Sequence, residues 1–136
     1  MQDKKNIAVT LVEILVTLII LAILIALVLP QFSTMRERSL SKEAMANLKL
    51  IDAAEKIYRM EEGFYYPYSS SVSDQQDINV NLKIAITAGN WGYDIAGNSG
   101  ASYVSAADRN GAGGYLDCEY SMSDTTAEPS PNASCP

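Results

Sequence analysis

One acidic side chain, Glu13, interrupts an apolar segment that extends from Ile7 to Leu29. A carboxylate in bilayer hydrocarbon costs roughly 2.5–3.5 kcal/mol on insertion scales, so an intramembrane acid usually has a role and a partner. The chemistry open to Glu13 is therefore a buried ion pair with a cation brought to it. The alternative is an acid tolerated near the end of an ordinary single-span anchor.

The only two cysteines, Cys118 and Cys135, lie near the C-terminus, and the chain has no histidine to complete a metal site with them. Their spacing in a small exported domain is typical of a disulfide and indicates an oxidising compartment. Closing such a loop would stabilise the fold by about 3 kcal/mol in the chain-entropy model. Two separate free thiols are the alternative.

The carboxylates beyond residue 62 outnumber the basic residues by eight to two, which disfavours general nucleic-acid binding on electrostatic grounds. A solvated acidic face is favoured over a calcium site, because no ligand loop of recognisable spacing is present. Without histidine, nucleophile elbow or phosphate loop, we expect no enzyme and no cofactor. The candidate calcium ligands are Asp108, Asp117, Glu119 and Asp124.

The apolar segment that carries Glu13 is long enough to span a bilayer as a helix. Lys4 and Lys5 precede it, which predicts a cytoplasmic N-terminus and an exported C-terminal part. No small-residue cleavage site follows the apolar run, so we do not expect removal by an ordinary signal peptidase.

Helical periodicity resumes beyond Pro30, where a kink is expected, and continues to Gly63. This stripe is expected to pack on a sheet, with a coiled-coil dimer as the alternative. Met45, Ala53 and Ile57 are expected to widen it, and Glu55 and Arg59 form a possible i, i+4 pair. The stripe consists of Leu40, Ala44, Leu48, Ile51, Ala54 or Glu55, and Tyr58.

The sequence pattern beyond Gly63 predicts a loop followed by a sheet. Residues 63–89 have loop composition, although the alternation at 80–86 could indicate a strand or irregular chain. Tyr65, Tyr66 and Tyr68 are expected to pack at the hinge between helix and sheet, with surface adhesion as the alternative. An antiparallel meander is predicted at 91–95, 103–106 and 115–120.

The segment from Ala8 to Pro30 resembles the class III signal and N-terminal helix of type IV prepilins and of type II secretion pseudopilins. In that family a short basic leader is removed before the apolar run, and the first mature residue is followed four residues later by Glu and twenty-one residues later by Pro. With Val9 as the first mature residue, Glu13 and Pro30 occupy both places. Ala8 and Val9 depart from the Gly and Phe that are commonest at the cleavage site.

The resemblance implies an α+β pilin fold, in which a long N-terminal helix packs on a small antiparallel sheet with a disulfide-closed C-terminal loop. It also implies cleavage between Ala8 and Val9, N-methylation of Val9, and a filament in which Glu13 pairs with the Val9 amine of a neighbour. The implied parts are a leader (1–8), a transmembrane and filament-core helix (9–30), an amphipathic exported helix (31–62), a loop (63–89), and a sheet with the disulfide region (90–136).

The partners implied are further copies of the chain, prepilin peptidase/methyltransferase, an inner-membrane assembly platform, and lipid before assembly. The expected location is the inner membrane and then an extracellular pilus that serves adhesion, motility or DNA uptake. A periplasmic pseudopilus of a type II secretion system is the first alternative. An uncleaved single-span protein with an exported binding domain is the second.

Overall fold

The computed structural model describes residues 10–87, 89–111 and 115–136, without the side chains of residues 29–31. The proposed cleavage site, Ala8 and Val9, lies outside these residues. The chain divides into two compact units, Met1–Arg36 and Glu37–Pro136, which are described separately. We call the second one the globular unit.

The first helix, α1, extends from Leu11 to Glu62. It ends where the sequence predicts, because Gly63 adopts a positive φ of 87° and its N–H donates to the Arg59 carbonyl. Glycine adopts this left-handed conformation without the steric cost that other residues incur there. The helical backbone continues through Pro30, and the kink expected there stays a prediction.

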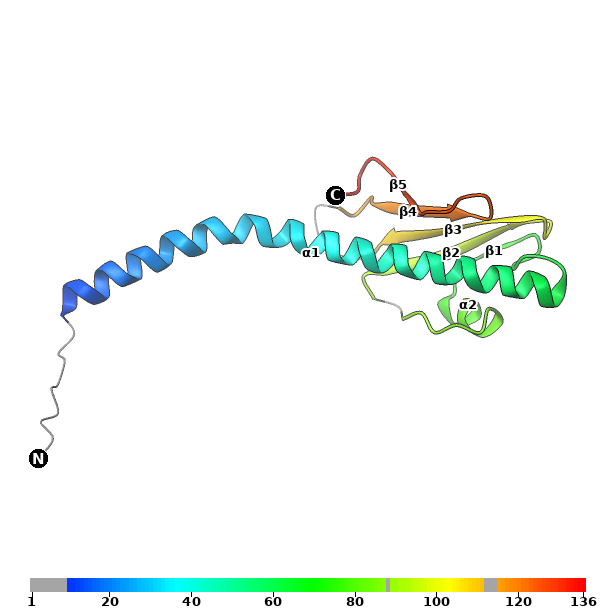
Figure 1. Cartoon of the computed structure of the whole chain (residues 1–136), viewed down its shortest axis with the longest axis horizontal. Coiled ribbons are helices and arrows are strands. Elements are labelled where there is room, and N and C mark those ends of the chain that lie inside the picture. The colour runs from blue at the N-terminus through cyan, green and yellow to red at the C-terminus, as the bar shows by residue number, and fades with distance from the viewer. Residues whose placement is uncertain (1–9, 88, 112–114) are drawn as a thin grey trace, which may run out of the picture. The chain divides into compact units, whose positions relative to one another are not determined.

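Within the globular unit, one face of α1 packs on the sheet as the periodicity predicts, in place of a coiled-coil dimer (Figure 1). Its buried residues are spaced by three and four. The predicted widening of this stripe is wrong for Ala53 and Ile57, which are exposed. The stripe consists of Leu40, Ala44, Leu48, Ile51, Ala54, Glu55 and Tyr58, of which Leu40 and Tyr58 are partly buried.

The sheet is antiparallel, with its strands in sequence order β1-β2-β3-β4-β5. This order confirms the predicted meander, which forms β2 to β4. Alternate residues of β2 face the core, as Trp91, Tyr93 and Ile95 do. The strands are β1 (Ser71–Val72), β2 (Trp91–Asn98), β3 (Ser102–Arg109), β4 (Glu119–Ser123) and β5 (Ser130–Pro131).

The segment 63–89 contains more regular structure than its loop composition predicts. A short helix, α2, extends from Gln75 to Asn81, and β1 precedes it. Asp74 caps α2, because its carboxylate accepts the N–H groups of Gln76 and Asp77. The strand interpretation of residues 80–86 is wrong, since the chain there leaves α2 through a turn and continues irregularly.

The C-terminal region departs from the predicted strand boundary. Residues 115–117 form a turn, and β4 begins only at Glu119. The predicted disulfide Cys118–Cys135 is confirmed, and it closes the chain after β5. The tail is therefore tied to the sheet by β4–β5 pairing as well as by the disulfide.

Candidate functional site

The first turn of α1 contains the acid that the sequence singles out. Thr10 caps the helix, because its hydroxyl oxygen accepts the Glu13 N–H at 3.3 Å and its carbonyl accepts the Ile14 N–H at 3.2 Å. The helix therefore begins at Leu11, with Thr10 as its N-cap. The Thr10-x-x-Glu13 spacing is that of a capping box.

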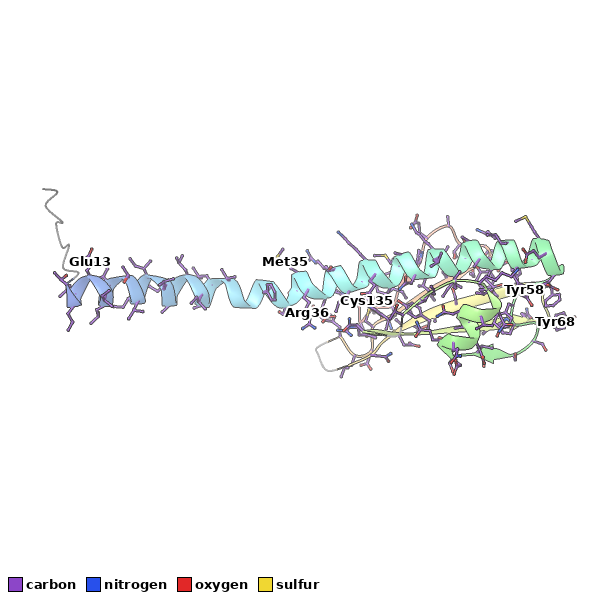
Figure 2. The ribbon with its side chains drawn as sticks, turned by 90° about the horizontal axis from the view of Figure 1, so that it is seen from below. Glu13, Met35, Arg36, Tyr58, Tyr68 and Cys135 are labelled. Atoms are coloured by element: carbon purple, nitrogen blue, oxygen red, sulfur yellow. A yellow bond between two sulfur atoms is a disulfide. The ribbon has the colours of Figure 1, made fainter. Side chains whose placement is uncertain are left out.

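Glu13 is the only charged residue between Leu11 and Val28, and every residue of that range is exposed. Its side chain projects from the first turn of the helix, among apolar side chains that also project outward (Figure 2). Within the described part of the chain, no cation pairs with its carboxylate. Any cation that pairs with Glu13 therefore lies outside the described residues.

The N-terminal part of α1 is apolar and long enough to cross a membrane. Its side chains cover a helix whose backbone hydrogen bonds are satisfied internally, which is the arrangement that lipid requires. An isolated subunit in water would expose this whole surface, so the segment needs lipid or other protein around it.

A second apolar surface lies on α1 within the globular unit, on the face opposite the core. Its residues are exposed and recur at intervals of four and three, as in a heptad seam. Two of its positions carry the small side chain of alanine, which allows a second helix to approach closely there. We call this surface the outer seam; it consists of Ala46, Leu50, Ala53, Ile57 and Met60.

Charged side chains connect α1 to the sheet at the start of the globular unit. The Arg109 guanidinium donates from Nε and Nη2 to the two carboxylate oxygens of Glu37, each at 3.1 Å. It also lies 5.7 Å from the Trp91 ring centroid and donates to the Asn90 carbonyl. The Trp91 indole donates to the Leu40 carbonyl of α1 at 2.9 Å. Sequence reasoning missed this group, because its members are as many as 72 residues apart.

Two further carboxylates lie buried at the centre of the same interface. Asp52 accepts the Tyr103 hydroxyl at 2.6 Å and the Lys56 ammonium at 2.7 Å. Glu55 accepts the backbone N–H of Tyr66 at 2.9 Å. The expected Glu55–Arg59 pairing on an exposed face is wrong, since Glu55 is fully buried.

The tyrosines after α1 pack at the end of the helix, as the hinge interpretation predicts. Tyr65 is buried and stacks edge-on against Tyr103, while Tyr58 lies edge-on to Tyr66. Tyr68 remains exposed beside this group (Figure 2). The hydroxyl of Tyr65 accepts a hydrogen bond from Arg59, which ties the loop to the last turn of α1.

Acidic residues gather on the outer face of the sheet, where Asp108 lies directly opposite Glu119 across β3 and β4. Partial burial, together with the charges of these two residues, raises the pKa of Asp94 on β2. Among the described residues, however, no group of His, Cys, Asp or Glu has the arrangement of a metal site. Asp117 and Asp124, the other candidate calcium ligands, lie in turns on either side of β4.

Residues 3–29 match the prokaryotic N-terminal methylation motif. Comparison with curated proteins and with solved structures finds no significant match. Proteins of the pilin type, to which the motif points, are structural rather than catalytic. The chain has the elements of the pilin fold, because it combines the long N-terminal helix α1, a small antiparallel sheet and the disulfide Cys118–Cys135. The motif at residues 3–29 supports a class III signal peptide of the kind found in type IV pilins and pseudopilins.

Proposed function

We propose that the chain is a structural subunit of a helical filament. Prepilin peptidase cleaves it between Ala8 and Val9 and methylates the new amine of Val9. The segment 9–30 holds the subunit in the inner membrane until an assembly platform transfers it into the filament. The observation that carries this proposal is Glu13, a lone charge on an exposed apolar helix that bears the methylation motif.

The counter-ion that we assign to Glu13 is the Val9 amine of a neighbouring subunit. A free amine at the start of a helix is disfavoured by the helix dipole, so it gains from a nearby carboxylate. Between packed apolar helices the pair would also determine the stagger of subunits, because a shift in register leaves two buried charges uncompensated. Both effects favour one axial step between successive copies.

The outer seam supports assembly from copies of the same chain. Its residues form an exposed apolar strip within the globular unit, where neighbouring positions on the helix are charged. Exposed apolar surface of this extent is a feature of interaction sites. Repeated heterologous contacts between copies produce an open helical assembly.

The filament that we propose is a surface pilus, which serves adhesion, motility or DNA uptake. The methylation motif is shared with pseudopilins, so a periplasmic pseudopilus is the alternative within this class. Imaging of filaments sheared from the cell surface separates the two, because a pseudopilus stays within the periplasm. An uncleaved anchor with an exported binding domain is the alternative outside the class.

The deciding experiment is mass spectrometry of the N-terminal peptide of the protein isolated from its native membrane. The proposal expects an N-methylated Val9 at the N-terminus. The same peptide should remain attached to residues 1–8 in cells that lack prepilin peptidase. A chain that retains Met1–Ala8 in normal cells would reject the proposal and support the uncleaved anchor.

A further inference from the structure

Glu55 lies in the core, so an ion pair on the exposed face of α1 does not account for its position. Its side chain is fully buried, and its Oε2 accepts the Tyr66 N–H at 2.9 Å. Its Oε1 is also buried and has no hydrogen-bond partner within the described part of the chain. A buried carboxylate charge that accepts a single hydrogen bond has a high free-energy cost. Protonation of the carboxylate removes this cost most simply.

The neighbouring charges do not offset a negative charge on Glu55. Asp52, one turn earlier on α1, already holds the Lys56 ammonium and the Tyr103 hydroxyl. The Arg59 guanidinium lies 4.6 Å from the Tyr65 ring centroid and donates to the Tyr65 hydroxyl. The ionisable groups around Glu55 are Asp52, Lys56, Tyr58 and Arg59 of α1, Tyr65 and Tyr66 of the following loop, and Tyr103 of β3.

The segment that Glu55 holds is the turn from α1 into the rest of the globular unit. Tyr65 N–H donates to the Gly100 carbonyl at 3.0 Å, and Asn81 donates to the Tyr66 hydroxyl at 3.1 Å. The bond from Tyr66 N–H to Glu55 joins the backbone of this segment to the buried face of α1, beside the edge-on ring contact of Tyr66 with Tyr58. A change in the charge of Glu55 therefore acts directly on the loop.

We propose that Glu55 is a proton-operated latch on the loop 64–68. With its proton, the carboxyl group remains in the apolar interface and holds the Tyr66 N–H. When the proton is lost to water, the carboxylate leaves the interface to become solvated and releases the loop. This device belongs to the globular unit and does not depend on assembly into a filament.

The expected direction of the pH response follows from the pKa of Glu55. Burial, opposed by the Tyr66 N–H and assisted by the Asp52 charge, raises this pKa from 4.5 to about 7. Because the folded state binds the proton more tightly than the unfolded state, the stabilisation is complete below pH 4.5 and is lost as pH rises through 7. Burial also raises the pKa values of Tyr58, Tyr66 and Tyr103, so these phenols remain neutral in that range.

The test is amide hydrogen exchange by NMR on the ¹⁵N-labelled full chain in detergent micelles at pH 5.5 and 8.5. After correction for the intrinsic exchange rate, we expect the protection of the Tyr66 amide to fall about 30-fold at the higher pH. The Trp91 amide in β2 serves as a reference and should keep its protection. Glu55→Gln, which cannot ionise, should abolish the pH dependence, whereas Glu43→Gln on an exposed part of α1 should retain it.

A parallel ¹³C titration of the wild-type Glu55 carboxyl avoids reliance on a variant that fails to fold. A midpoint near 7 supports the latch, and a midpoint near 4.5 overturns it. Unchanged Tyr66 protection in the wild type also overturns it. Equal losses at Tyr66 and Trp91 reject a local latch, because they show that the whole unit opens.

Discussion

Residues 11–28 and the globular unit differ in where their apolar side chains lie. In the globular unit the apolar residues form a core, and most buried polar groups find partners within the chain. In residues 11–28 every side chain is exposed, and the lone carboxylate has no partner among the described residues. The stability of the globular unit is therefore internal, whereas that of residues 11–28 depends on lipid or other subunits. Substitutions in the two regions should affect different measurements.

Glu13→Gln should give the largest effect, a loss of filaments with no loss of fold. The uncharged amide cannot form an ion pair with an ammonium group. The ion pair that we propose to fix the stagger of neighbouring helices is therefore lost. The measurement is filament yield after shearing, with membrane-bound subunit quantified in the same cells. Glu43→Gln, which alters an exposed acid in the globular unit, is the matched control and should assemble normally. Normal yield from Glu13→Gln would remove the proposed role of the ion pair.

Arg109→Met should destabilise the globular unit by about 4 kcal/mol. It removes the charge partner of Glu37 where both side chains are mostly buried, at 7% and 15% exposure, and breaking one side of a buried pair costs several kcal/mol. The loss is measured by urea unfolding in detergent micelles, followed by fluorescence of Trp91, the single tryptophan.

Arg38→Met, at an exposed position of α1, is the control for Arg109→Met and should change stability by less than about 0.5 kcal/mol. The double variant Glu37→Gln with Arg109→Met should recover part of the loss, because the Glu37 carboxylate is then no longer left without the Arg109 charge. A loss below about 1 kcal/mol for Arg109→Met would show that the pair contributes no more than a surface ion pair.

The parts of the fold that sequence could predict are those with local signals. The helix followed from spacing, its end from Gly63, the meander from alternation, and the disulfide from the two cysteines. The short helix α2 was missed because Val80, Leu82, Ile84 and Ile86 alternate, although its buried residue Ile78 and its C-cap Leu82 are four positions apart, as in a helix.

The buried polar groups could not be predicted, because their partners are distant in sequence. Glu55 and Arg59 have the spacing of an exposed helical pair, and only the reversal of the chain after Gly63 brings the Tyr66 N–H to Glu55. The Arg109–Glu37 pair joins residues 72 apart. The N-terminal methylation motif could be recognised from sequence for the opposite reason, since its residues are consecutive in the chain.

Replacing both cysteines, Cys118→Ala with Cys135→Ala, should destabilise the globular unit by about 3 kcal/mol through the gain in unfolded-state entropy. The same unfolding assay measures the loss. Addition of a reductant should lower the stability of the wild type by a similar amount and leave the double variant unchanged. Equal stability of the wild type with and without reductant would show that β4–β5 pairing alone secures the tail.

Lys49→Ala should cause the smallest loss of stability among these substitutions in the globular unit. Lys49 pairs with Glu128 at 2.5 Å, but the two side chains are 47% and 71% exposed. Water and salt screen such a pair, and ordering two flexible side chains offsets part of the attraction. We expect a loss of less than about 1 kcal/mol, which should shrink further in 0.5 M salt, whereas the loss for Arg109→Met should persist. Similar salt dependence for both variants would mean that burial does not separate these ion pairs, and the distinction between internal and surface charge in the globular unit would fail.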